Sequence, residues 1–109
     1  AYGCTAKVEI NEGYPVTINT PIESDIAIEV AKKIVKTKAV KDNLAPSMGA
    51  EDFAYMLEKK PGAYIWLGAG EGKSGCMLHN SKYDFNDEII PLGISYWYNL
   101  VENQLSVES

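Results

Sequence analysis

The chain has 109 residues, a formal net charge of −5 and ten basic residues, all of them lysines. This length suits one domain of ordinary size with a hydrophobic core of its own. The acidic balance argues against a nucleic-acid-binding surface, and no apolar run approaches the length of a membrane span.

Two cysteines, Cys4 and Cys76, lie far apart in the sequence. They form no chelating pair and do not make a disulfide scaffold, so we expect a reduced, cytoplasmic setting. The chain begins with alanine, and no basic segment, apolar stretch and cleavage site follow as in a signal peptide. We therefore expect the chain to be a piece of a longer protein.

The first predicted element is a strand over residues 7–12. Polar and apolar residues alternate there in the order Lys-Val-Glu-Ile-Asn-Glu, which is typical of a strand with one solvated face. It is predicted to be an antiparallel or edge strand. Gly13 to Pro15 ends it, and residues 16–19 continue in extended form.

Helical signals begin at Pro21. Glu23 and Asp25 complement the dipole in the first turn, and lysines gather towards the end of the helix. The apolar stripe of this helix is predicted to consist of Ile26, Val30 and Ile34, with Val35 at its margin.

A second helix is predicted over residues 51–60, after a connector at 39–45 that allows a brief strand and a turn at 46–49. Its acidic residues come first and its lysines last, and Pro61 stops it. By spacing alone, Ser47 is a cap or turn residue, and Glu51 and Asp52 are partners of the helix dipole.

Residues 63–67 form a continuous apolar run between Pro61-Gly62 and a glycine-rich loop, which predicts a strand buried on both faces. The chain then returns to the sole histidine, His79. Histidines often bind metals, but a lone one is more often a surface or hydrogen-bonded core residue. No second ligand lies at a chelating spacing, so a complete metal site cannot be assembled locally.

The last predicted helix has Pro91 as an early residue. Its apolar stripe is predicted to cover a sheet and consists of Ile90, Ile94, Trp97, Val101 and Leu105. The alternation of strands and helices along the chain predicts an α/β fold, a layered sheet with covering helices.

Five motifs follow one another along the chain: Ser47-Met48-Gly49-Ala50-Glu51-Asp52-Phe53, Pro61-Gly62-Ala63, Leu67-Gly68-Ala69-Gly70, Leu78-His79 and Tyr83-Asp84-Phe85. In this order, and over nearly the whole chain, they resemble the C-terminal part of a family of two-metal amidohydrolases. That family includes aminoacylases, hippurate hydrolase and the indoleacetyl-amino-acid hydrolases, within a wider group of metallopeptidases.

The resemblance implies two parts. Residues 1–13 correspond to the last strand of a lid (dimerisation-like) domain, and residues 14–109 to the C-terminal part of an α/β catalytic domain. The segment from Tyr14 to Asn19 matches the family's Tyr-Pro-x-x-x-Asn return from the lid. Residues 13–19 would therefore act as the hinge.

The resemblance also assigns roles to five residues. His79 supplies one ligand to a centre of two divalent metal ions, and its imidazole suits Zn, Mn, Ni or Co. Gly49 and Ala50 lie on the substrate side of the loop beside the metals, where the backbone approaches substrate. Glu51 and Asp52 belong to the same substrate-binding loop and order it and the helix start.

The implied reaction is hydrolysis of N-acyl amino acids, such as hippurate, or of small peptides, with two metals and a carboxylate general base. The family's catalytic glutamate and other ligands have no counterpart here, and Cys4 lies outside the Cys-x-His motif. We therefore expect no catalytic residue in this chain and no activity of the chain alone. The alternative is a non-catalytic binding or oligomerisation module derived from such an enzyme. Either way, a truncated sheet predicts a homo-oligomer.

Overall fold

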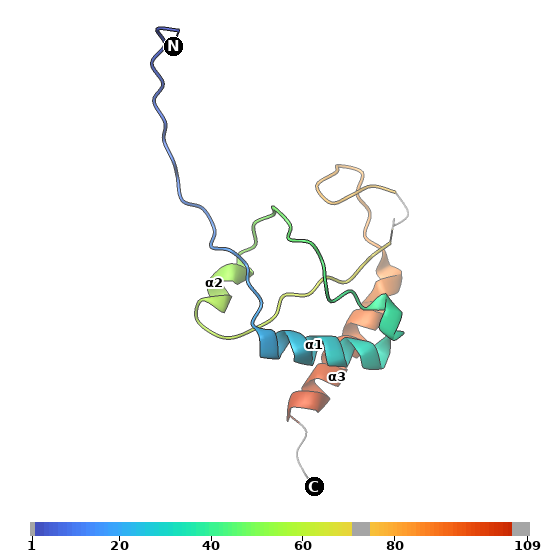
Figure 1. The fold of residues 1–109 in the computed structure, drawn as a ribbon. Helices are drawn as coiled ribbons and strands as arrows, with labels where there is room; N and C mark the ends of the chain where they lie inside the picture. Colours follow the sequence, from blue (N-terminus) through green and yellow to red (C-terminus); the bar gives the residue numbers. More distant parts are fainter. Residues whose placement is uncertain (1, 71–74, 106–109) are drawn as a thin grey trace.

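The computed structural model describes residues 2–70 and 75–105, and it is helical (Figure 1). The elements, in order, are α1 (Pro21–Ile34), the 3₁₀-helix η1 (Thr37–Ala39), α2 (Phe53–Leu57), the 3₁₀-helix η2 (Asp87–Ile89) and α3 (Ile90–Leu105). No strand occurs in these residues. The prediction of an α/β fold with a layered sheet is therefore wrong for this chain.

The strands predicted at 7–12 and 63–67 do not form. Residues 7–12 belong to an extended arm (Figure 1), residues 63–67 have no helix or strand, and η1 overlaps the connector at 39–45 only at Ala39. A strand needs a neighbour whose N–H and C=O groups complete a ladder. Within the described residues, neither segment has a backbone ladder partner. The prediction that 63–67 is buried on both faces is also wrong, because Ile65, Trp66 and Leu67 are 43–65% exposed.

The helix α1 begins where its sequence predicts, at Pro21. Thr20 is extended at the N-cap, Pro21 occupies the first turn, and Glu23 lies there with it. Lys32 and Lys33 lie in the last turn, where they complement the dipole. The helix ends when the backbone of Val35 becomes extended, at φ −119° and ψ 162°.

The core lies along α1 and is small. Ala27, Val30 and Ala54 are the only buried apolar residues in the described part of the chain, and Val30 alone is fully buried. The first two lie on α1, which packs against α3, whereas Ala54 lies on α2. Folding of this chain therefore rests mainly on one helix pair.

The helix α3 confirms Pro91 as an early helical residue but presents its apolar stripe to solvent. Leu92, Tyr96 and Leu100 are less exposed and line hollows between α3 and its neighbours. Trp97, Val101 and Leu105 of the stripe also border these hollows. The prediction that the stripe covers a sheet is wrong, since there is no sheet beneath it. The exposed stripe consists of Ile90, Ile94, Trp97, Val101 and Leu105, which are 47–72% exposed.

Residues 2–19 form an extended N-terminal arm that runs away from the helices (Figure 1). The radius of gyration is 19.2 Å, against about 13 Å for a compact domain of this length. Val8 and Ile10 in the arm are 79% and 87% exposed. None of the helices described is long and apolar enough to cross a membrane.

Candidate functional site

A hydrogen-bonded junction joins the end of the arm to the start of the apolar segment 62–67. The Asn19 side chain accepts from the backbone N–H of Tyr64 (2.7 Å) and donates to its carbonyl (2.9 Å). Beside it, the backbone N–H of Thr20 donates to the carbonyl of Gly62 (2.9 Å). The carboxamide of Asn19 thus fills the place that a neighbouring peptide group would take.

Thr20 reinforces this junction through its hydroxyl group. The hydroxyl accepts from the N–H of Gly62 (2.9 Å). It also lies within hydrogen-bond distance of the Gly62 carbonyl and of Glu23 Oε2, to one of which it donates. Threonine is a preferred N-cap residue, but the Thr20 side chain bonds to Gly62 across the fold. No side-chain cap bond forms on α1.

The Tyr64 side chain reaches the beginning of the α2 segment. Its hydroxyl donates to Glu51 Oε2 at 2.6 Å. The bond to this carboxylate raises the pKa of Tyr64, with smaller contributions from burial and from the charges of Glu51 and Asp52. The Tyr64 ring also lies 5.5 Å from that of Phe53 and 6.0 Å from that of Trp66, measured between ring centres.

The four predicted substrate-side residues lie in the chain that leads into α2. Gly49 and Ala50 are exposed, and the Gly49 N–H donates to the Ser47 hydroxyl (3.2 Å) in a local turn. Glu51 is half-buried by its contact with Tyr64, whereas Asp52 is exposed at the N-cap and makes no side-chain cap bond. The helix itself occupies only the middle of the predicted range 51–60.

His79 lies on an exposed turn with its backbone in the left-handed region, at φ 64°. A non-glycine residue there costs of order 1 to 3 kcal/mol and is held by its surroundings. The next turn, at Ser81 and Lys82, is closed by Asn80, whose side chain accepts from the N–H of Lys82 and whose carbonyl accepts from the N–H of Tyr83, both at 2.9 Å. His79 itself is exposed to solvent.

The structure does not bring the five predicted residues into one site. No hydrogen bond or ion pair joins His79 to residues 49–52 in the described part of the chain, although both loops extend to the same side of the helix pair in Figure 1. Among these residues, no group of three or more His, Cys, Asp or Glu side chains is placed to hold a metal ion. The donors that the structure describes therefore do not fit a complete metal centre.

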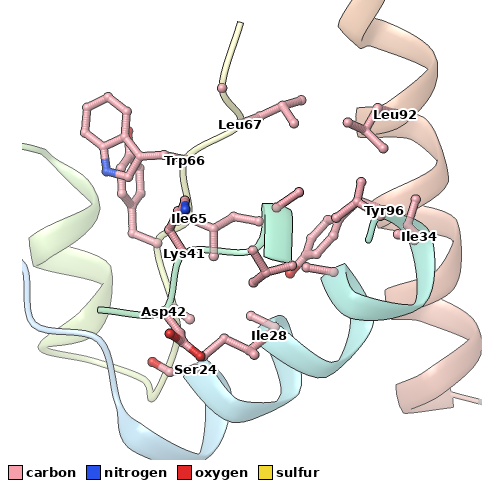
Figure 2. A pocket seen from close by; sticks show the side chains of 18 of the residues that line it. Ser24, Ile28, Ile34, Lys41, Asp42, Ile65, Trp66, Leu67, Leu92 and Tyr96 are labelled. Carbon is pink, nitrogen blue, oxygen red and sulfur yellow. The ribbon is translucent and has the colours of Figure 1, made fainter. Parts of the chain in front are cut away.

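An apolar groove of about 840 Å³ lies between α1, residues 39–44, the segment 63–68 and α3 (Figure 2). Ile65 and Leu67 extend towards α3, where Leu67 packs against Gly93, while Trp66 points to the other side of the segment. Burial raises the pKa of Tyr96, which lines the same groove. Only Lys41 and Asp42 bring charge to its lining.

Comparison with known proteins shows which family this chain resembles. The model of peptidase family M20/M25/M40 matches residues 4–103. The chain is 38% identical over 95 residues to thermostable carboxypeptidase 2 of Saccharolobus solfataricus, covering 84% of this chain and 23% of that protein. It is also 38% identical over 94 residues to hippurate hydrolase of Campylobacter jejuni, covering 86% and 24%.

A third relative is N-acetyldiaminopimelate deacetylase of Pediococcus pentosaceus, 30% identical over 109 residues that cover 97% of this chain and 27% of that protein. The chain therefore spans about a quarter of the length of the curated relatives that it matches. No solved structure shows a significant match to it.

Proposed function

This chain belongs to peptidase family M20/M25/M40, and on that premise we propose that it is part of a metal-dependent amidohydrolase acting on N-acyl amino acids or small peptides. The observation that carries the proposal is the family match over residues 4–103, which includes all five motifs and His79. The relatives' names support the substrate class, since hippurate and N-acetyldiaminopimelate are N-acyl amino acids.

In this proposal His79 supplies one neutral imidazole nitrogen to a centre of two divalent metal ions. Zn, Mn, Ni and Co all accept such a ligand. The other ligands and the general base come from outside this chain, because the described residues form no group able to hold an ion. The exposure of His79 supports this role, because groups from outside this chain can reach an exposed side chain.

The loop before α2 forms part of the substrate wall in the same proposal. Gly49 and Ala50 are exposed and have small side chains, so substrate can approach their backbone closely. Glu51 and Asp52 complete this loop. The arm up to residue 13 is proposed to belong to the lid domain, and residues 14–109 to the catalytic domain.

An exchange experiment tests this function. We expect the chain alone to hydrolyse no hippurate. When the chain replaces its matching segment in the C. jejuni hippurate hydrolase, to which it is 38% identical, we expect metal-dependent hippurate hydrolysis to persist. A folded but inactive hybrid, or hydrolysis by the isolated chain, contradicts the proposal. The unmodified hippurate hydrolase serves as the control.

A second candidate, a non-catalytic assembly module, is favoured by the exposed stripe on α3. Its five residues recur at spacings of four, three, four and four, close to the pattern by which helices pair along their length. Homo-oligomerisation through α3 of a second copy would cover them. This candidate concerns the chain as a free-standing protein.

Self-association of the isolated chain separates the two candidates. If α3 pairs with α3 of a second copy, light scattering behind size exclusion should give twice the monomer mass at about 100 μM, and Trp97→Lys should restore the monomer. Lys82→Glu, outside α3, is the control and should remain a dimer. A monomer at every concentration argues against the assembly module.

A further inference from the structure

Hydrogen bonds at Tyr64 connect three distant segments of the described chain. Its backbone N–H and carbonyl are both held by Asn19, at the end of the arm. Its side-chain hydroxyl is held by Glu51, in the loop before α2. Tyr64 itself belongs to the apolar segment that borders the groove. The end of the arm therefore holds the backbone of Tyr64, and the loop before α2 holds its side chain.

The contacts on both sides of Tyr64 are short and specific. The bonds to Asn19 measure 2.7 and 2.9 Å and the bond to Glu51 measures 2.6 Å, all within the range of well-formed hydrogen bonds. The bond to the Glu51 carboxylate is charge-assisted, a class about twice as strong as neutral ones. Because these bonds are short, we expect a displacement of Asn19 to move Glu51 as well.

The arm has few other connections to the rest of the chain. The two bonds of Asn19 are the only hydrogen bonds that residues 2–19 make with other described residues, and a ring contact between Tyr14 and Tyr55 at 5.6 Å accompanies them. The arm is thus joined to the folded part by the peptide chain at Thr20, by the hydrogen bonds to Tyr64 and by the ring contact with Tyr55.

We infer that Tyr64 is a positioning residue that couples the end of the arm to the loop carrying Gly49 and Ala50, through Asn19 on one side and Glu51 on the other. Glu51 accordingly orients this loop. When the arm moves, Tyr64 carries the displacement to Glu51, and the two exposed residues next to Glu51 move with it. That the coupling serves substrate positioning rests on the proposed function, whereas the coupling itself is a property of this chain.

A cycle of variants in the 109-residue chain, with neither substrate nor metal, tests the coupling. Asn19→Ala releases the backbone of Tyr64, and Tyr64→Phe removes only the hydroxyl that reaches Glu51. We expect Asn19→Ala to shift the amide NMR signals of Gly49 and Ala50, thirty residues away in sequence. In the Tyr64→Phe background, Asn19→Ala should leave the Gly49 and Ala50 signals unshifted, because the hydrogen bond to Glu51 is already missing.

Matched controls separate coupling from loss of structure. Asn11→Ala, in the part of the arm without hydrogen bonds to the folded part, should leave the Gly49 and Ala50 signals unchanged. Far-UV circular dichroism monitors α1 and α3, and Asn19→Asp serves as a milder variant, because aspartate still accepts from the Tyr64 N–H.

Two results overturn the inference. One is an equal shift of the loop signals by Asn19→Ala with and without the Tyr64 hydroxyl, or no shift at all. The other is a random-coil position for the Tyr64 Cζ signal in the unmodified chain, which shows the bond to Glu51 to be missing. Because no substrate is present, an inactive hippurate hydrolase hybrid leaves these readouts untouched, so failure of the function and failure of the coupling are told apart.

Discussion

Replacing His79 by asparagine in the hippurate hydrolase that carries this chain is expected to lower hippurate hydrolysis by about 100-fold or more. Loss of a residue that only hydrogen-bonds to a metal ligand already costs about 10- to 100-fold in affinity or activity, and loss of the ligand itself should cost at least as much. Asparagine tolerates the left-handed backbone that His79 adopts at φ 64°, so the turn should survive while the imidazole is lost.

Two measurements complete this experiment. Steady-state kinetics give the rate, and elemental analysis of the purified hybrid should show that the metal content per subunit falls with it. Lys82→Ala, in the neighbouring turn, is the control and should change neither quantity. Full activity and full metal content in the His79→Asn hybrid would remove His79 from the proposed centre.

Replacing Val30 by aspartate is expected to unfold the helix pair in the isolated chain. Val30 lies on α1 and is fully buried. A buried carboxylate without a partner lowers the free energy of unfolding by several kcal/mol. The core holds only three buried apolar residues, so little stability remains to offset that loss. The milder Val30→Ala should lower the free energy of unfolding by about 2 kcal/mol, near the transfer free energy of two methylene groups.

Urea titration followed by circular dichroism at 222 nm measures both effects. Ile22→Asp is the matched control, because Ile22 lies on the same helix and is 71% exposed. It should leave the transition midpoint nearly unchanged. A cooperative transition of unaltered midpoint in Val30→Asp would mean that the α1–α3 packing is not what holds the chain together.

The sequence predicted the local elements better than their assembly. Pro21 and Pro91 marked the starts of α1 and α3, because a proline in the first turn sacrifices no helical hydrogen bond. Alternation at 7–12 marked extended backbone. Whether such a segment pairs depends on a neighbour, and periodicity carries no information about whether the neighbour exists within the same chain. The stripe on α3 is exposed for the same reason, because no sheet lies beneath it in the described residues.

The candidate site was predictable in part. The motifs led to the family, and the family comparison confirmed that resemblance. The roles of His79 and of residues 49–52 remain predictions. Asn19 and Tyr64 were missed as partners, since their contact spans 45 positions and no spacing rule reaches that far. A polar hydroxyl within the apolar run at 63–67 was the one signal for it, because such a group needs a hydrogen-bond partner when buried.

The helix pair that forms the core also sets the order of events during synthesis. Residues 35–89 lie between α1 and α3, so α1 leaves the ribosome roughly 3 to 11 s before its partner at 5–20 residues per second. An isolated helix of 14 residues is marginal in water. The nascent chain therefore carries Val30 uncovered throughout that interval, and a chaperone that recognises short apolar helices has its chance to bind before α3 emerges.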